Sequence, residues 1–500
     1  MTSTLESRST APRQRTHYQV TFTVIVVATT AYSMLQSLVT PVLPTIQHSL
    51  HTSQSTVTWV LTAYLLAASI ATPIVGRLGD MMGKKRVLVA VLVMLAVGTL
   101  ASALATSIGV MIVARVIQGA GGAILPLAFG IIRDEFPREK VAMAVSTTAA
   151  LLAVGGGLGI VLAGPIVDAL NYHFLFWLPL IFIVIAAGAA QLVIPESQNL
   201  TPGRISVLPG VLLSAWLVAL LVAVSEGSVW GWGSARTVGL LVLSAVLVPV
   251  WVVSESRAAQ PLVDMRMMRI PAVWTTNLVA LLFGAGMYSV MAFLPEFLQT
   301  PASAGYGFGA SITASGVFLL PMTVTMFVSG LLSGQLADGW GSKRVLVVGS
   351  VLTAAAFLVL TAAHDEKWEI YLFSALVGAG LGFAFAAMSN IIVESVPAAQ
   401  VGVASGMNAN IRTIGGSIGA AVMGSIVTSG AAAGGLPVET GYGHGFLFLF
   451  VAAVLCAAAA VLVPARRRAA LSARADESPD IVVRNAEAAL VPAAPVVEVE

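Results

Sequence analysis

The sequence predicts an all-α polytopic membrane protein with fourteen transmembrane helices. Composition is the first reason: hydrophobic residues make up 57% of the 500 residues, whereas Asp, Glu, Lys and Arg together make up 10%. In a typical soluble domain about 25% of the residues are charged. The second reason is the number of long apolar runs, and the third is a string of residues that occurs twice in the chain.

The apolar runs are long enough to cross a bilayer as helices. About 20 predominantly apolar residues are needed to span a hydrocarbon layer of ~30 Å. In chain order, we predict transmembrane helices over 20–40, 58–78, 87–106, 108–131, 141–164, 173–194, 207–225, 236–253, 272–294, 313–333, 345–363, 368–391, 402–428 and 444–463.

The positions of Lys and Arg predict the orientation. If both termini are cytoplasmic, fourteen crossings place 21 of the 25 Lys and Arg residues on the cytoplasmic side, as the positive-inside rule requires. We therefore expect a multi-pass protein of the cell (cytoplasmic) membrane, with a cytoplasmic N-terminal tail over 1–19. The Ala/Val/Pro-rich segment 465–500 is expected to be a disordered cytoplasmic tail.

An internal repeat predicts how the helices are grouped. Nine of fourteen positions are identical between GRLGDMMGKKRVLV, which begins at Gly76, and GQLADGWGSKRVLV, which begins at Gly334. The copies are eight spans apart, so two extra helices separate two six-helix halves. We predict a 6+2+6 arrangement: the N-terminal half over 20–195, two inserted helices over 207–254 and the C-terminal half over 272–464.

The repeated loops are candidate cytoplasmic gates. Their glycines allow a tight reversal of the chain, and Asp80 and Asp338 can meet the positive N-terminus of the helix that follows. A charged turn that obeys the positive-inside rule is the alternative reading. The gate residues that we predict are Gly76, Asp80, Gly83, Lys84, Lys85, Arg86, Gly334, Asp338, Gly341, Lys343 and Arg344.

These loops resemble motif A of the major facilitator superfamily. The segment from Arg115 to Gly122 resembles motif B of that superfamily, and Gly415–Gly419 resembles a feature of its fourteen-helix drug:proton antiporter subfamily. The resemblance covers about residues 20–465 and implies the major facilitator fold and multidrug or antibiotic efflux. It also implies that Arg115, with Gln118 and Gly119, belongs to a motif that lines the transport cavity and takes part in proton coupling.

Two segments depart from the family pattern. The first helix carries no acidic residue between Ser33 and Pro41, where members often have an intramembrane Asp. In the fifth helix, Gly159–Pro165 replaces the antiporter pattern Gly-Pro-x-x-Gly-Gly. A proton-driven cycle must therefore use another titratable group.

Ionisable residues within or near the apolar runs are candidates for proton coupling, because a charge at the bilayer centre costs at least ~2.5–3.5 kcal/mol. Arg412 lies about 15 Å into its helix at 1.5 Å per residue. Glu296 has apolar neighbours that disfavour its ionised form, and we expect it to face the cavity opposite the first helix. The alternative role for Glu296 is that of an anchor at the membrane interface. The competing candidates for the proton carrier are Asp168, Glu226 and Arg115.

Polar, aromatic and sulfur-containing residues within the runs are candidate cavity residues that suit an amphipathic, aromatic substrate. They are Tyr32, Gln36, Trp59, Tyr64, Asn277, Met287, Tyr288, Asn408 and Arg412.

The functional prediction is a monomeric exporter driven by the proton motive force through alternating access. A proton-coupled importer or symporter of a small organic solute is the alternative. The sequence shows no nucleotide-binding loop, metal cluster or nucleophile triad, so we expect neither an enzyme nor a cofactor or metal. A net charge of +2 gives no reason to expect nucleic acid as a partner.

Overall fold

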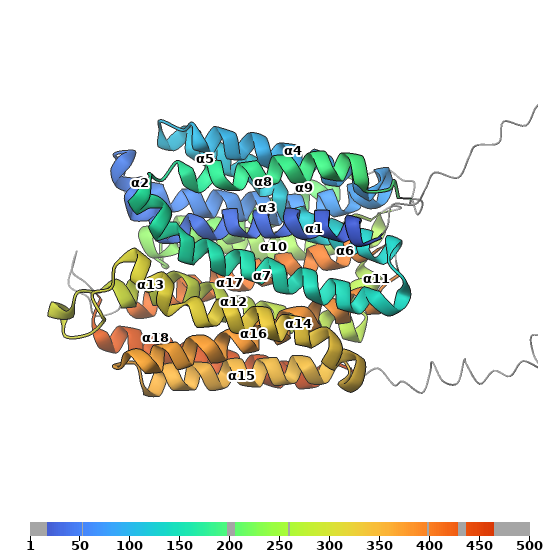
Figure 1. Cartoon of the computed structure of the whole chain (residues 1–500). Coiled ribbons are helices and arrows are strands. Elements are labelled where there is room, and N and C mark those ends of the chain that lie inside the picture. The colour runs from blue at the N-terminus through green and yellow to red at the C-terminus, as the bar shows by residue number, and fades with distance from the viewer. Residues whose placement is uncertain are drawn as a thin grey trace, which may run out of the picture. The chain divides into compact units, whose positions relative to one another are not determined.

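The computed structural model describes residues 18–52, 54–197, 206–258, 261–397, 400–428 and 437–464. Within these ranges all regular structure is helical, which confirms the predicted all-α class. The helices belong to one compact unit that ends at Val463. The long helices lie side by side and nearly parallel, so the loops gather at two opposite ends (Figure 1).

We keep the names of the predicted groups for the elements that fall within their ranges. The predicted N-terminal half contains α1 (Tyr18–Leu38), η1 (Thr40–Val42), α2 (Leu43–Ser49), α3 (Gln54–Met82), α4 (Lys84–Ala103), α5 (Ile108–Gln118), η2 (Gly119–Ala123), α6 (Ile124–Glu135), α7 (Arg138–Ala169) and α8 (Phe174–Val193). The predicted inserted pair corresponds to α9 (Val207–Trp230) and α10 (Ala235–Arg257), which pack on each other. The short helix α11 (Met265–Met268) leads into the C-terminal half.

The C-terminal half contains α12 (Pro271–Gln299), η3 (Ala302–Ala304), α13 (Ile312–Phe318), α14 (Leu320–Trp340), α15 (Ser342–Ala362), α16 (Lys367–Ser395), α17 (Val401–Val427) and α18 (Glu439–Leu462). Two predicted spans are interrupted. The chain tightens into the 3-10 helix η2 within Ile108–Glu135, and α13 gives way to α14 within Ile312–Trp340.

Thirteen helical segments in the described part of the chain are long and apolar enough to cross a membrane, and each matches one predicted run. The remaining predicted run, 402–428, forms α17, which is 27 residues long but includes Asn408, Asn410 and Arg412. All three of these polar side chains are buried. This helix is therefore polar where it packs inside the bundle.

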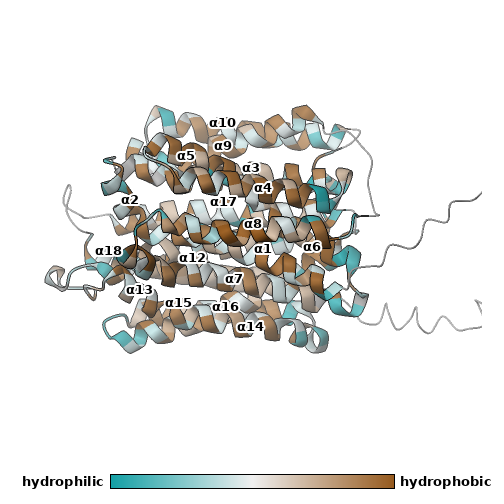
Figure 2. Cartoon of the chain, turned by 45° about the horizontal axis from the view of Figure 1, so that its top comes forward, coloured by the Kyte–Doolittle hydropathy of each residue, from teal (hydrophilic) through white to brown (hydrophobic). Residues whose placement is uncertain are grey.

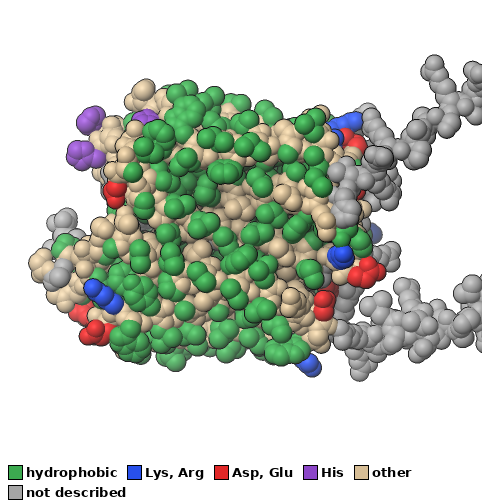
Figure 3. Space-filling view, in the orientation of Figure 1, with side chains coloured by type: hydrophobic (Ala, Val, Ile, Leu, Met, Phe, Trp, Pro, Cys, Tyr) green, Lys and Arg blue, Asp and Glu red, His purple; other side chains and the backbone are tan. Residues whose placement is uncertain are grey.

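The surface agrees with a membrane environment. Hydrophobic residues dominate the middle of the helices and hydrophilic residues gather towards their ends (Figure 2). In the space-filling view, apolar side chains cover the face between two ends that carry the Lys, Arg, Asp, Glu and His side chains visible there (Figure 3). A belt of this kind is expected where lipid tails contact the protein.

The internal repeat is visible in the backbone. Gly83 and Gly341 occupy the same position in the two repeated loops, and each directly precedes a helix, α4 or α15. Their φ angles are 104° and 86°, in the region that favours glycine because a Cβ would be strained there. The two loops therefore reverse the chain in the same way.

Glycines allow the closest helix contacts in both halves. In the N-terminal half, a Cβ on Gly155 of α7 would lie 2.6 Å from the carbonyl oxygen of Thr30 in α1. In the C-terminal half, Gly415 of α17 touches the backbone of Leu281 in α12, and a Cβ there would overlap its carbonyl oxygen. Small residues bring helix backbones together in membranes, where packing replaces the hydrophobic effect between helices.

The two halves touch where the repeated loops lie. Asn390 of α16 donates a hydrogen bond of 2.8 Å to Ser146 of α7. Arg133 of α6 donates to the carbonyl oxygen of Val393 in α16. A Cβ on Gly76 of α3 would lie 3.2 Å from the carbonyl oxygen of Gly402 in α17. The bundle is therefore closed at this end, which we call the gate end.

The glycine contact between α12 and α17 predicts a stability effect. Gly415→Ala should lower the apparent Tm of the purified protein by several degrees, because overpacking costs about 1–3 kcal/mol. Gly239→Ala in α10 is the matched control, since a Cβ there meets nothing within 4 Å. It should leave the Tm unchanged or raise it. Equal melting temperatures for the two variants in thermal unfolding would contradict the contact.

Candidate functional site

A cavity lies between the two halves in the middle of the bundle. Its lining comes from α1, η1, α3, η2, α6 and α7 of the first half and from α12, α14, α16 and α17 of the second. It reaches Thr40, beyond the end of α1 that is remote from the gate end. A site built by both halves is the place where a bound molecule can sense their relative movement.

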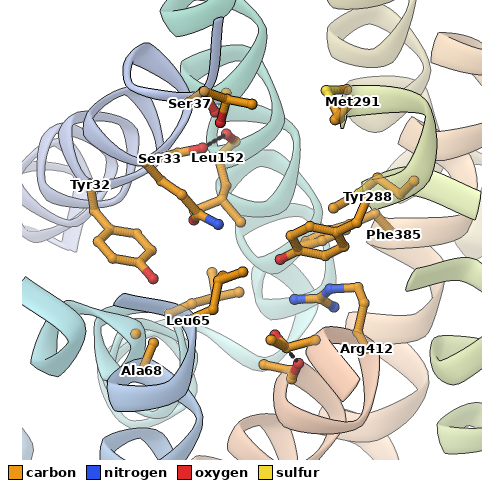
Figure 4. Close-up of a pocket in the computed structure, with 18 of the residues that line it drawn as sticks. Tyr32, Ser33, Ser37, Leu65, Ala68, Leu152, Tyr288, Met291, Phe385 and Arg412 are labelled. Atoms are coloured by element: carbon orange, nitrogen blue, oxygen red, sulfur yellow. Dashed lines mark hydrogen bonds between the residues drawn. The ribbon is translucent and has the colours of Figure 1, made fainter. Parts of the chain in front are cut away.

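The lining is aromatic and sulfur-rich. It includes three tyrosines, Tyr32, Tyr64 and Tyr288, and four methionines, Met287, Met291, Met322 and Met326. Ser33, Ser37, Gln36 and Asn410 add polar groups. Flexible methionines adapt to ligands of different shape, and aromatic rings offer flat surfaces for stacking. Figure 4 shows Tyr32 and Tyr288 on opposite sides of the space.

Arg412 is the charged side chain among the residues that line this cavity. It comes from the middle of α17 and is 9% exposed. Its guanidinium carbon lies 4.4 Å from the centre of the Phe385 ring. The guanidinium points towards Tyr288 and the cavity (Figure 4). Among the described residues, no carboxylate forms an ion pair with Arg412.

Five of the remaining predicted cavity residues line the space: Tyr32, Gln36, Tyr64, Met287 and Tyr288. The prediction is wrong for Asn277, Asn408 and Trp59. Asn408 is one helical turn from Arg412 towards the gate end, where it donates a hydrogen bond of 2.9 Å to Asn277. This hydrogen bond joins α17 to α12 outside the cavity lining. Trp59 lies more than one turn before Tyr64 in α3 and is half-buried outside the lining.

Sequence reasoning missed part of the lining. Met322, Met326 and Phe385 belong to it. The methionines are four residues apart and so share one face of α14. Nothing in the sequence separates that face from the other apolar faces of the helix. Phe385 lies in an apolar run and carries no signal in the sequence that distinguishes it from its neighbours. Its contact with Arg412 makes it part of the site.

The motif B arginine does not line the cavity. Arg115 is fully buried behind Tyr64, and its guanidinium carbon lies 4.2 Å from the centre of that ring. It donates hydrogen bonds to the Val60 carbonyl oxygen at 2.9 Å and to Gln118 at 2.7 Å. The expectation that it faces the transport cavity is therefore wrong in this conformation. Arg115 fixes the position of Tyr64, which does line the cavity.

The other motif B residues also support the fold. Gln118 donates to Ser102 of α4 at 3.0 Å. Gly119 begins η2 and lies against α3, where a Cβ would overlap Ala67. Neither residue lines the cavity, but Gly122 at the other end of η2 does.

The carboxylate candidates lie outside the cavity. Glu296 is exposed near the end of α12. It follows the cavity residue Met291 by five positions, which rotates it by about 140° at 3.6 residues per turn. The expectation that it faces the cavity is therefore wrong. Asp168 is exposed and accepts a hydrogen bond of 3.0 Å from Thr313, which joins α7 to α13. Glu226 in α9 is 7% exposed and also lies outside the lining.

A buried ionic cluster lies at the gate end. The amino group of Lys84 lies 2.8 Å from Asp134 and 3.7 Å from Asp80. Both oxygens of Asp80 lie 3.5 Å from the position that a Cβ would take on Gly402, in the first turn of α17. The sequence predicts that Asp80 meets the start of the helix that follows it, and its partner Lys84 is the first residue of that helix, α4. The Asp80 carboxylate also approaches the N-terminus of α17 from the other half.

In the second repeated loop, the corresponding residues are not buried. Asp338, Gly341 and Arg344 are exposed, and Lys343 is half-buried. In the first loop, Lys85 is half-buried and Arg86 is exposed. Arg86 forms an ion pair of 3.2 Å with Glu196. Gly334 approaches α7, where a Cβ would lie 3.3 Å from the Cα of Met143. The repeated motif therefore has two different environments.

Comparisons with known proteins agree with this geometry. The model of the Major Facilitator Superfamily matches residues 25–420 and 276–495. The chain is 31% identical over 395 residues to the tetracenomycin C resistance and export protein of Streptomyces glaucescens, covering 77% of this chain and 71% of that protein. It is 30% identical to the cephamycin export protein CmcT of Amycolatopsis lactamdurans, covering 88% of this chain and 92% of that protein.

Two further proteins are similar to this chain. The multidrug transporter protein MdtP of Bacillus subtilis is 27% identical over 75% of this chain and 69% of its own length. The crystal structure of the human organic anion transporter MFSD10 superposes with a TM-score of 0.66 at 16% identity, covering 88% of this chain and 99% of that chain. At this identity the structural match supports the fold alone.

The buried cluster predicts different effects for two basic residues of α4. Lys84→Met should destabilise the protein by about 3–5 kcal/mol, because removing one partner leaves buried charges uncompensated. Arg86→Met, two residues away, removes an exposed ion pair and should cost less than ~1 kcal/mol. Thermal unfolding of both purified variants measures the difference. If the two variants melt at the same temperature, the Lys84 cluster does not stabilise the gate end.

Proposed function

The chain belongs to the Major Facilitator Superfamily, and we propose that it exports an amphipathic aromatic compound, such as an antibiotic or other natural product, using the proton motive force. The central observation is the cavity between the two halves, where tyrosines, methionines and Arg412 meet. The relatives named as tetracenomycin C and cephamycin export proteins support the outward direction.

The arrangement of contacts supports alternating access. The halves touch at the gate end, through Asn390 with Ser146 and through Gly76 with Gly402, whereas the cavity lining extends away from that end to Thr40. In the proposed orientation the gate end is cytoplasmic. This conformation is then the one in which the cytoplasmic path is closed, after the substrate has entered the cavity from the inside.

The proposed membrane topology has fourteen crossings arranged 6+2+6 in the cell membrane, with both termini in the cytoplasm. It adds α17 to the thirteen apolar spans, because this helix is 27 residues long and packs between α12 and α3. Of the inserted pair, α9 packs against α3 and α17, and α10 packs on α9. The cavity itself needs only the two six-helix halves, so a monomer is sufficient.

The first repeated loop is the proposed cytoplasmic gate. Asp80, Lys84 and Asp134 hold a buried cluster against the first turn of α17. A carboxylate near a helix N-terminus is favourable because of the helix dipole. Opening the gate end requires α17 to leave Asp80, and this contact therefore favours the closed state. The exposed Asp338 has a smaller role in this scheme.

Proton coupling is assigned to Glu226 in this proposal. Of the three carboxylates that the sequence suggested, Glu226 alone is buried, while Asp168 and Glu296 are exposed. Ionisable groups that are buried in or beside a transmembrane span are expensive and mark proton or substrate pathways, and Glu226 lies near the end of the apolar span Val207–Gly227. Helix α9, which carries Glu226, packs on α17. Trp232, just after the end of α9, donates a hydrogen bond of 2.9 Å to Ser425 of α17. Protonation of Glu226 can therefore influence the helix that carries Arg412.

Transport in everted membrane vesicles tests the function. A panel of fluorescent aromatic compounds should accumulate inside vesicles that contain the protein when their interior is acidified, and a protonophore should abolish the accumulation. Vesicles without the protein are the control. Accumulation in right-side-out vesicles with an acidic exterior, and none in everted ones, would instead establish the importer or symporter alternative.

Two glutamine variants test the proton carrier. Glu226→Gln should abolish most of the pH-driven accumulation, because the amide that replaces the carboxylate cannot bind and release a proton in the transport cycle, while downhill flux continues. Glu296→Gln removes an exposed carboxylate outside the cavity and is the matched control, with accumulation close to that of the unmodified protein. Normal uphill transport by Glu226→Gln, at equal expression, would place the carrier elsewhere.

A further inference from the structure

We infer that the central cavity selects an aromatic carboxylate and binds its carboxylate group directly on Arg412. This inference rests on the proposed function and specifies its substrate class. Arg412 is the cationic side chain of a lining that contains no Asp, Glu, Lys or His among its described residues. It has no ion-pair partner among the described residues, and it lies in the middle of a helix that spans the bundle.

Because Arg412 is buried, a negatively charged group beside it would be stabilising. Its side chain is in the cavity wall and 9% exposed. An isolated charge in a low-dielectric interior is unfavourable unless a partner compensates it. The Phe385 ring, 4.4 Å away, supplies part of that compensation through a cation–π contact. A ring carries no net charge, so the guanidinium remains a positive site that faces the cavity (Figure 4).

The acids of the surrounding helices are directed elsewhere. In α3 and α6, Asp80 and Asp134 are bound to Lys84 at the gate end. In α7, Asp168 is exposed and bonded to Thr313 of α13. Glu296 is exposed at the opposite end of α12. A second cation, Arg115, lies behind the Tyr64 wall of the cavity. The charges around the site therefore favour an anion and disfavour a cation.

The geometry fits a carboxylate on an aromatic body. The Phe385 ring lies against the Arg412 guanidinium, whose N–H groups can donate hydrogen bonds to a ligand. Guanidinium edges match carboxylates through two parallel hydrogen bonds. Around this point, Tyr32, Tyr64 and Tyr288 supply aromatic surface, and the methionines of α12 and α14 supply adaptable apolar surface. One end of the ligand is thus recognised by charge and the rest by stacking.

The test compares three probes that share one aromatic body: pyrenebutyrate, pyrenebutanol and pyrenebutylamine. Their binding to the purified full chain in nanodiscs of neutral lipid is measured by fluorescence titration. The butyrate should bind about 10- to 100-fold more tightly than the butanol, the factor expected for charge-assisted hydrogen bonds. The butylamine should bind most weakly. Equal or tighter binding of the amine by the unmodified protein would overturn the inference without any variant.

Variants assign the preference to Arg412. Arg412→Gln should remove the preference for the butyrate while the butanol keeps its affinity within about twofold, because only the charged contact is lost. Arg412→Lys should retain a reduced preference for the butyrate, since lysine keeps the positive charge but lacks the paired N–H donors of the guanidinium. Thr413→Val is the control, because Thr413 also lines the cavity but carries no charge. An unchanged preference in Arg412→Gln would overturn the assignment.

The binding assay is independent of transport. If the butyrate binds through Arg412 but no vesicle accumulates it, the proposed function fails and the carboxylate site stands. If everted vesicles accumulate pyrenebutylamine as well as pyrenebutyrate, and Arg412→Gln changes neither, export stands and the substrate class is wrong.

Discussion

The close contact of α17 with its neighbours is the constraint on which the cavity and the gate end both depend. Gly415 of α17 lies on the backbone of Leu281 in α12, and this contact leaves Arg412 on the side that faces the cavity. Asn410 donates to the Ser69 carbonyl oxygen of α3 at 2.6 Å. The first turn of the same helix meets Asp80. A movement of α17 therefore changes the cavity and the gate end together.

The repeat shows how one motif can acquire two roles. Both copies place a left-handed glycine before a helix, at Gly83 and Gly341, so the local backbone is the same. The tertiary surroundings are different: Asp80 is enclosed by Lys84 and α17, whereas Asp338 is exposed. A buried ionic cluster is sensitive to the loss of any partner, while an exposed charge is screened by water. The asymmetry therefore arises from packing.

Arginine has two uses in this bundle. Arg115 is held by the Val60 carbonyl oxygen and Gln118 and supports the Tyr64 ring from behind. Arg412 is held by the Phe385 ring alone among the described contacts and faces the cavity. The first arginine has hydrogen-bond partners within the protein, and the second is placed to find one in a ligand. The difference lies in which acceptors surround each guanidinium.

The sequence by itself determined the helical class, thirteen of the spans, the repeat and several cavity residues, including Tyr32, Tyr288 and Arg412. These follow from run length, composition and the cost of a charge in an apolar helix. Only the tertiary structure decided that Arg115, Asn408 and Glu296 lie outside the cavity lining. The reason is physical: lipid-facing and interior faces of a membrane helix are both apolar, so periodicity does not reveal its rotation. Packing against neighbouring helices fixes that rotation.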